Sequence, residues 1–297
     1  MRACFFLTVI LSFSIGLASE PSASAQKSKK ISANNAEKVG LAQVNAQALE
    51  DAKKATLARD RVKASESLLV AIKSEKKPSK LSELKGMLSK VSTQFYTEAG
   101  QQLFELGRSL YSTDAASAST RFRDAFQKET MNTLVGLYLA RAELAIGDCD
   151  SSLKEVRKAR SMDPFDPNLI LVELQALVCL GELERYQSAL GSIDSDSAKE
   201  LEPYLSVLKL QVQTIEREFA SAQESFEKIS SAHPEFPEIY YWGIQIGKAL
   251  KSSTKPYKEK YIQLCQKLGK DARTRFAKEP RVCGALADVE STVEENL

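Results

Sequence analysis

Residues 133–166 read TLVGLYLARAELAIGDCDSSLKEVRKARSMDPFD, and this stretch decides the fold. It contains two amphipathic helical patterns joined by the turn Gly147-Asp148. The turn recurs 34 residues later as Gly181-Glu182, and the same interval separates Leu137 from Leu171. A period of this length with two helices in each unit predicts a helix–turn–helix repeat protein.

The composition agrees with an all-helical chain. Of 297 residues, 43% are hydrophobic and 27% are charged, with only 13 Gly and 9 Pro. The net charge of +2 is too small to suggest nucleic-acid binding. The charge is unevenly spread: residues 26–90 carry +8, residues 91–250 carry −9 and residues 251–281 carry +7. An acidic central region is therefore flanked by two basic ends.

The first 25 residues have the pattern of a signal peptide. Arg2 precedes an apolar run of 13 residues, 5–17, which is too short to span a bilayer as a helix. Ala23-Ser24-Ala25 is an A-x-A cleavage signal, so Gln26 is the expected mature N-terminus. An uncleaved anchor is the alternative. No N-x-S/T sequon follows, which favours a bacterial periplasm over a eukaryotic secretory pathway.

The next two segments lead into the repeats. Residues 26–45 are rich in Lys, Ser, Asn and Ala, and we expect a flexible basic arm. Residues 46–94 are expected to form a helical extension. A helical pattern over 46–74 and a second one after Pro78 would make a hairpin that packs on the first repeat.

Residues 95–270 carry further matches to the 34-residue period. The matching residues are Leu103, Leu106, Gly107, Leu110, Ala118, Phe122 and Ala125 in the first unit, Leu139, Ala140, Ser152, Val156, Ala159 and Pro164 in the second, and Ala222, Phe226, Ile229 and Pro234 in the fourth. These are the residue types that tetratricopeptide repeats favour at positions 4, 7, 8, 11, 20, 24, 27 and 32, so the region resembles that family. The third unit departs from the pattern, with Tyr186 and Ile193 where alanine is usual.

The resemblance implies an all-α, right-handed superhelical solenoid of about four to five repeats. An irregular helical bundle is the alternative. The tetratricopeptide resemblance also places Cys149 at position 17 of one repeat and Cys179 at position 13 of the next, where stacking of the repeats would bring the two cysteines together. Cys265 and Cys283 would then form a second disulfide, closing a loop in the tail, residues 271–297. Free buried thiols are the alternative to both bridges.

The sequence is poor in catalytic motifs. The single histidine, His233, precedes Pro234 at a turn between repeats, where a surface role is more usual than catalysis. No glycine-rich phosphate loop, H-E-x-x-H or C-x-x-C motif occurs. We therefore expect no enzyme activity, no cofactor and no metal.

The resemblance also implies a concave groove built from the first helix of each repeat. In this family positions 5 and 9 of that helix face the groove, and Tyr111 and Tyr204 would add anchors at its edges. The expected apolar row at position 5 is Phe104, Leu137, Leu171, Val207 and Trp242, and the polar row at position 9 is Arg108, Arg141, Gln175 and Gln211. Burial of the apolar row in a tightly wound core is the alternative.

These features predict an exported, periplasmic scaffold that binds a protein or peptide partner in its groove, in the assembly of an envelope machine. An alternative is a binder of anionic envelope polymers or surfaces that uses the two basic ends. No transmembrane span is expected after signal cleavage, and nucleic acid is not an expected partner.

Overall fold

The computed structural model describes residues 43, 45–269 and 278–294. The expected signal peptide and nearly all of the expected basic arm lie outside these residues. The described residues contain helices and no strand. After a first helix over residues 45–57 come α2 (Arg61–Ser74), α3 (Pro78–Thr93), α4 (Glu98–Tyr111), α5 (Ala115–Lys128), α6 (Thr133–Ile146), α7 (Cys149–Met162), α8 (Pro167–Leu180), α9 (Leu183–Leu190), α10 (Ser195–Glu200), α11 (Glu202–Ile215), α12 (Phe219–Ala232), α13 (Pro237–Ala249), α14 (Lys255–Leu268) and α16 (Leu286–Glu294).

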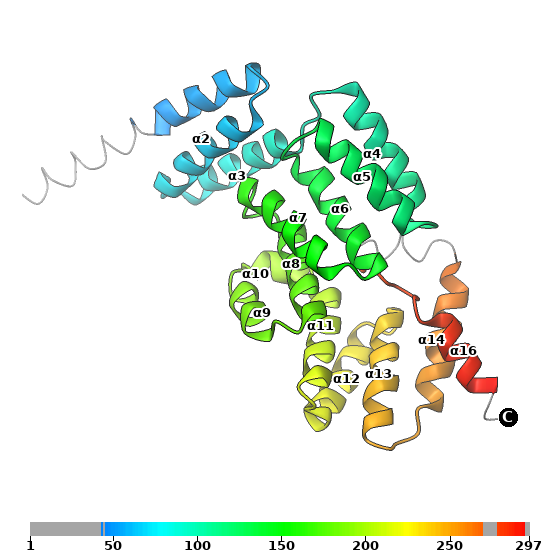
Figure 1. Ribbon diagram of the computed structural model, residues 1–297. Helices are drawn as coiled ribbons and strands as arrows, with labels where there is room; N and C mark the ends of the chain where they lie inside the picture. The colour runs from blue at the N-terminus through cyan, green and yellow to red at the C-terminus, as the bar shows by residue number, and fades with distance from the viewer. Residues whose placement is uncertain (1–42, 44, 270–277, 295–297) are drawn as a thin grey trace, which may run out of the picture.

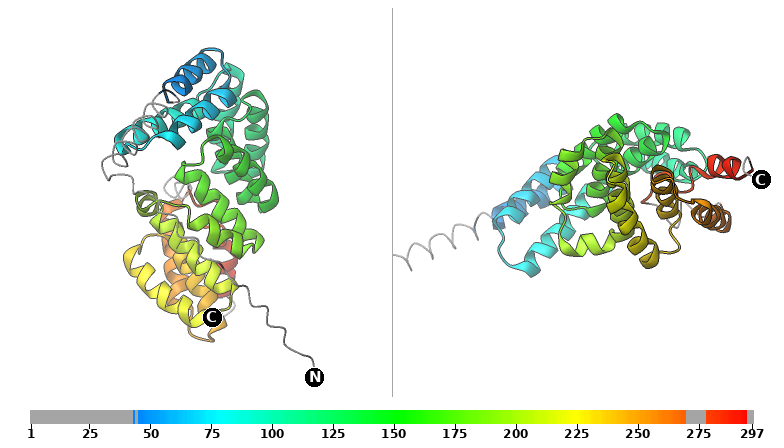
Figure 2. Two further views of the ribbon diagram at one scale, coloured as in Figure 1. Left: turned by 90° about the vertical axis from the view of Figure 1, so that its left-hand side faces the viewer. Right: turned by 90° about the horizontal axis from the view of Figure 1, so that it is seen from below.

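The helices from α4 to α14 form consecutive antiparallel pairs. The pairs are α4/α5, α6/α7, α8/α9, α11/α12 and α13/α14, and the first helices α4, α6, α8, α11 and α13 also contact one another in that order. Figures 1 and 2 show the pairs following each other along one curved path. The predicted tetratricopeptide-like solenoid of helix–turn–helix repeats is therefore confirmed.

Small residues at the helix contacts explain how closely the pairs approach. A Cβ added to Gly107 of α4 would lie 2.6 Å from the ring of Phe122 on α5. A Cβ added to Gly243 of α13 would likewise lie 2.5 Å from the ring of Phe226 on α12. In both places an aromatic ring fills the space that a side chain would take, so the aromatic core of the repeat depends on glycine.

The recurring turn is a helix C-cap that needs glycine. Gly147 ends α6 with φ of 87° and Gly181 ends α8 with φ of 72°, both in the left-handed region. Asp148 then caps α7 through a bond from the Ser151 N–H. The 34-residue period thus reflects one turn geometry used twice.

The third repeat is irregular. Its second helix, α9, has only 8 residues, and the short helix α10 follows before α11 begins the fourth repeat. Tyr186 takes the place of the usual alanine and is buried. Helix α9 ends at Leu190, where Gly191 is its C-cap residue.

The N-terminal extension contains three helices, one more than the expected hairpin. The first helix ends after residue 57. Arg59 then has a φ of 58°, and the Asp60 carboxylate accepts a hydrogen bond from the Lys63 N–H at the start of α2. The helical pattern over residues 46–74 therefore belongs to two helices. The extension packs against α6 and α7 of the second repeat as well as against the first.

A buried ion pair fastens this extension to the solenoid. Arg61 of α2 donates to the carbonyls of Thr130 (2.5 Å) and Gln94 (2.6 Å) and to Glu129 Oε2 (2.7 Å). Burial would raise the pKa of Glu129, but bonds from Thr97 and Arg61 hold it below its usual value. Both charges are fully covered and well bonded, so each depends on the other.

Both expected disulfides are present. Cys149 at the start of α7 is bonded to Cys179 near the end of α8, with 6.1 Å between their Cα atoms. Cys265 of α14 is bonded to Cys283, with 5.6 Å between Cα atoms. The second bridge holds the chain after residue 278 against the last repeat.

Candidate functional site

A cleft of about 660 Å³ runs along the first helices of the later repeats. Its walls come from α6, α8, α11 and α13, and the remaining wall is formed by residues 279–288. Of the eleven residues expected in the groove, the four that line this first-helix cleft are Gln175, Val207, Gln211 and Trp242. The cleft therefore lies where a groove was expected, but part of it is already covered by the chain itself.

The covering part is residues 278–285, which we call the C-terminal strap. Its first residue is held on both sides: Gln175 Nε2 donates to the Lys278 carbonyl at 2.9 Å, and the Tyr204 hydroxyl hydrogen-bonds to the Lys278 backbone. Lys278 Nζ also reaches Glu200 Oε1 at 2.7 Å. Figure 1 shows the strap, in orange and red, running from beside α6 and α8 to α16. The strap thus contacts two of the expected groove residues that are distant in sequence, Gln175, which is 103 positions away, and Tyr204.

The middle of the strap meets the C-terminal end of α6. Arg281 Nε donates to the Leu144 carbonyl at 3.1 Å, and a Cβ at Gly147 would lie 2.7 Å from Arg281 Nη2. The last carbonyls of a helix have no partner within the helix and carry its partial negative charge. The end of α6 is therefore a place that accepts a cationic side chain.

The far end of the strap meets a buried carboxyl group. Glu238 of α13 is buried, and its Oε1 accepts a bond from the Cys283 N–H at 2.6 Å. Burial, assisted by the nearby Glu279, raises the pKa of Glu238 to about 8. Desolvation likewise raises the pKa of Glu279 to about 7, which Arg281 partly offsets. The charged or titratable side chains facing this pair are Arg281, Asp288, Tyr241 and Tyr261.

The expected apolar row is mostly buried in the helix packing. Phe104, Leu137, Leu171 and Val207 are at most 5% exposed, and only Trp242 keeps part of its ring surface. The superhelix is wound tightly enough that neighbouring first helices cover position 5. The first four side chains therefore form core, and only Val207 and Trp242 border the cleft.

The expected polar row divides into exposed and buried residues. Arg108 is exposed and pairs with Glu105 at 3.2 Å on its own helix. Arg141, expected to face the groove, is instead 5% exposed, and its Nη2 donates to Asn168 Oδ1 at 3.4 Å. Burial lowers the pKa of Arg141, and the ring of Tyr138 lies 5.8 Å from its guanidinium carbon. Arg141 is therefore not accessible as a groove residue, because residues of α4, α8 and α11 surround it.

The two expected tyrosine anchors lie near this arginine. Tyr111 of α4 is buried, while Tyr204 of α11 is partly exposed, and both interact electrostatically with Arg141. The first helices of repeats one, two and four thus bring Tyr111, Arg141 and Tyr204 together. Tyr204 also touches the strap, at Lys278.

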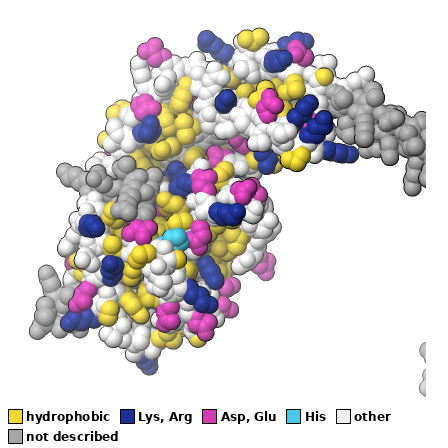
Figure 3. Space-filling view, turned by 180° about the vertical axis from the view of Figure 1, so that it is seen from behind, with side chains coloured by type: hydrophobic (Ala, Val, Ile, Leu, Met, Phe, Trp, Pro, Cys, Tyr) yellow, Lys and Arg dark blue, Asp and Glu magenta, His cyan; other side chains and the backbone are white. Residues whose placement is uncertain are grey.

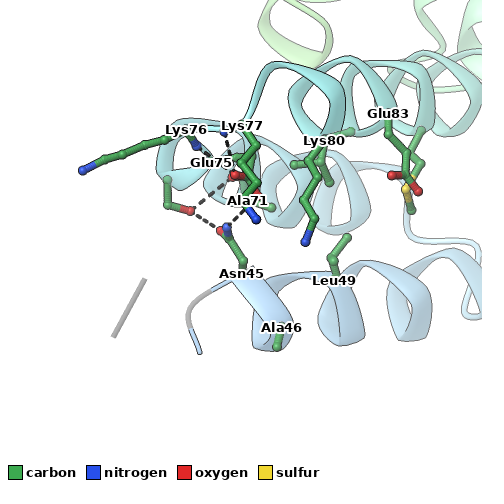
Figure 4. A pocket seen from close by; sticks show the side chains of 12 residues that line it. Asn45, Ala46, Leu49, Ala71, Glu75, Lys76, Lys77, Lys80 and Glu83 are labelled. Carbon is green, nitrogen blue, oxygen red and sulfur yellow. Dashed lines mark hydrogen bonds between the residues drawn. The ribbon is translucent and has the colours of Figure 1, made fainter. Parts of the chain in front are cut away.

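A second groove, of about 770 Å³, lies in the N-terminal extension. Figure 4 shows its walls: the first helix with Asn45 and Leu49, and the α2–α3 junction with Lys77 and Lys80. The Glu75 carboxylate there accepts bonds from the backbone N–H groups of residues 76 and 77. This groove has an apolar floor and a basic rim, and it lies near the basic N-terminal region noted in the sequence.

The described residues offer little for catalysis or metal binding. No group of three or more His, Cys, Asp and Glu side chains in them is placed to hold a metal ion. His233, the cyan side chain in Figure 3, pairs with Glu202 at the surface, among mixed charged and apolar side chains. No helix within the described part of the chain is long and apolar enough to cross a membrane.

The chain was compared with family models, curated proteins and solved structures. No family model matches the chain. No curated protein matches it either. Among solved structures, a tetratricopeptide repeat protein from Parabacteroides merdae is similar, with 13% identity over 84% of this chain and 93% of that one and a TM-score of 0.39.

The strap across the candidate cleft was not predicted from the sequence. The cysteines predicted a closed loop in the tail, but not its contacts with α6 and α8. Gln175 and Tyr204 were named for the groove, yet their partner was expected to be another protein. The sequence signal was the pair Lys278 and Arg281 beside Pro280, which marks a short basic segment outside a helix.

Proposed function

We propose that this protein is a non-catalytic, exported scaffold that captures a short segment of a protein partner in its first-helix cleft. One observation carries this proposal: a short turn-forming segment of the chain already lies there, held by an amide, a hydroxyl and a helix end. Repeat solenoids use their extended inner surfaces for binding, so the location fits the fold. Capture in the assembly of an envelope machine is the setting we favour.

Export from the cytoplasm is supported by two observations. The first 25 residues carry a signal-peptide pattern, and the chain forms two disulfides. Disulfides persist in oxidising compartments such as the bacterial periplasm. N-terminal sequencing of the fractionated protein tests this part: a mature chain starting at Gln26 outside the cytoplasm supports it, and a cytosolic chain starting at Met1 contradicts it.

Site-specific photo-crosslinking in living cells tests the scaffold function. A photoreactive residue replaces Gln211 or Trp242 in the cleft, and a matched control carries it at Lys228, which is exposed on α12. We expect one protein to be crosslinked repeatedly from both cleft positions and not from the control. Equal crosslinking from all three positions, or none from the cleft, would contradict the proposal.

The basic ends support a second candidate, binding of an anionic envelope polymer. The observation in its favour is the basic rim of the N-terminal groove, with Lys76, Lys77 and Lys80 around an apolar floor. Salt concentration separates the two candidates. Polymer binding through lysines should weaken steeply between low and physiological ionic strength, whereas binding in a partly covered cleft should weaken little.

A further inference from the structure

The strap does not fill the cleft it occupies. About 660 Å³ remains open between the strap and the first helices. Ile146 at the end of α6 stays about half exposed on this wall, and the ring of Trp242 is only partly covered. A segment whose sole purpose was to complete the core would be expected to close such space, because protein interiors are densely packed.

The strap is held by polar contacts and by two apolar anchors that another segment can supply. Gln175 and Glu238 bind its backbone, and the α6 carbonyl end binds the side chain of Arg281. Pro280 and Val282, on either side of Arg281, are buried. Backbone contacts do not depend on side-chain identity, so the side-chain requirements left for an occupant are one cationic residue near α6 and an apolar residue on each side of it.

The walls of the cleft favour a cationic occupant. Glu200 beside the cleft pairs with Lys278 of the strap, and Asp288 of α16 lines the cleft. The C-terminal carbonyls of α6 add partial negative charge. In the part of the cleft that the structure describes, the cationic side chain is Arg281 of the strap itself. An arginine fits this place because its planar head presents several donors to carbonyl oxygens.

We propose that the C-terminal strap is an internal stand-in for the partner, and that the partner's binding segment forms a similar turn and carries an arginine that replaces Arg281 at the end of α6. The strap then keeps the cleft closed until that segment displaces it. The Cys265–Cys283 disulfide keeps the displaced strap attached beside the cleft, where it can return. This inference rests on the proposed scaffold function and names the chemistry of the partner.

A peptide-binding experiment on the full-length protein tests the inference. The probe is a fluorescently labelled peptide, Lys-Glu-Pro-Arg-Val-Ser-Gly-Ala-Leu, which copies residues 278–286 with serine for cysteine. A second peptide has glutamate in place of its arginine. The probes are added to wild type, to Arg281→Ala and to Cys265→Ser/Cys283→Ser, with Arg185→Ala on α9 as a matched control. Hydrogen exchange over residues 278–286 reports whether the strap is released.

We expect faster hydrogen exchange of the strap in Arg281→Ala and in Cys265→Ser/Cys283→Ser than in wild type. These two variants should also bind the arginine peptide about tenfold more tightly than wild type or Arg185→Ala does, because the loss of one charge-assisted hydrogen bond changes an affinity by about tenfold. The glutamate peptide should not bind. Equal binding to wild type and variants would overturn the inference, and so would no binding to a folded variant with a released strap. Loss of the fold in both variants would also overturn it, because a removable segment cannot be required for folding.

The cellular crosslinks keep this test separate from that of the proposed function. If Gln211 still crosslinks one protein while the probe fails, the scaffold function stands and the strap inference falls. If the probe binds but no cleft position crosslinks a protein in cells, the strap chemistry stands and the scaffold function falls.

Discussion

Replacing Gly107 by alanine should destabilise the solenoid, although alanine is the better helix former. The new Cβ would lie 2.6 Å and 2.7 Å from two ring atoms of Phe122. That ring is fully buried and packs against the rings of Phe104, Tyr111 and Tyr138, so it has no free space to move into. Overpacking of this kind costs about 1–3 kcal/mol, and the gain in helix propensity returns about 0.5–1 kcal/mol. We expect a net loss of about 1–2 kcal/mol.

Gly86 provides the matched control. It also lies inside a helix, α3, but it is exposed and an added Cβ would meet nothing within 4 Å. Gly86→Ala should therefore stabilise the protein by about 0.5–1 kcal/mol. Urea unfolding followed by far-ultraviolet circular dichroism measures both variants against wild type. If Gly107→Ala is as stable as Gly86→Ala, the close approach of α4 and α5 does not exist in solution and the packing argument is refuted.

Three further predictions concern buried charges and the disulfides. Arg61→Met should lower the free energy of unfolding by about 3–5 kcal/mol, because it leaves Glu129 buried without its cation; a loss below about 1 kcal/mol in urea unfolding would contradict this. Cys149→Ser should cost about 2–4 kcal/mol, and non-reducing peptide mapping of wild type should recover Cys149 linked to Cys179. The pKa of Glu238 is raised from 4.5 to about 8, so its contribution to stability is full below about pH 4.5 and is lost as the pH rises through 8. The Tm should therefore fall between pH 5 and pH 9, and a Glu238→Gln variant with the same slope would disprove this origin.

Much of the fold could be predicted because its determinants are local. The turns at Gly147 and Gly181 both require a residue in the left-handed conformation, which favours glycine. The 34-residue period is therefore visible in the spacing of these glycines. The break at Arg59 was missed because a non-glycine residue with positive φ gives no such signal. The insertion of α10 was also missed, although Asp194 caps it through the N–H groups of residues 196 and 197.

The candidate site was less predictable because its contacts are long-range. Gln175 and Lys278 are 103 residues apart, and Leu144 and Arg281 are 137 apart. No periodicity links such pairs. Whether a position-5 side chain faces solvent or core depends on how tightly the superhelix winds, which is the sum of small rotations over all repeats. Leu171 therefore matched the groove pattern and is nevertheless fully buried.

The burial of that apolar row changes what recognition in this solenoid requires. With Leu137 and Leu171 covered, the large apolar side chains left exposed on the described first helices are Leu106, Ile146 and Ile215, and of these Ile146 lines the cleft. The groups that hold the strap are the amide of Gln175, the carboxyl of Glu238 and the carbonyl end of α6. Two of these bind backbone and one binds a cation, so under the proposed function they would recognise a short turn and a single charge. Selectivity among partners would then come from how well a segment fills the open space beside Trp242 and Ile146, which the strap leaves empty.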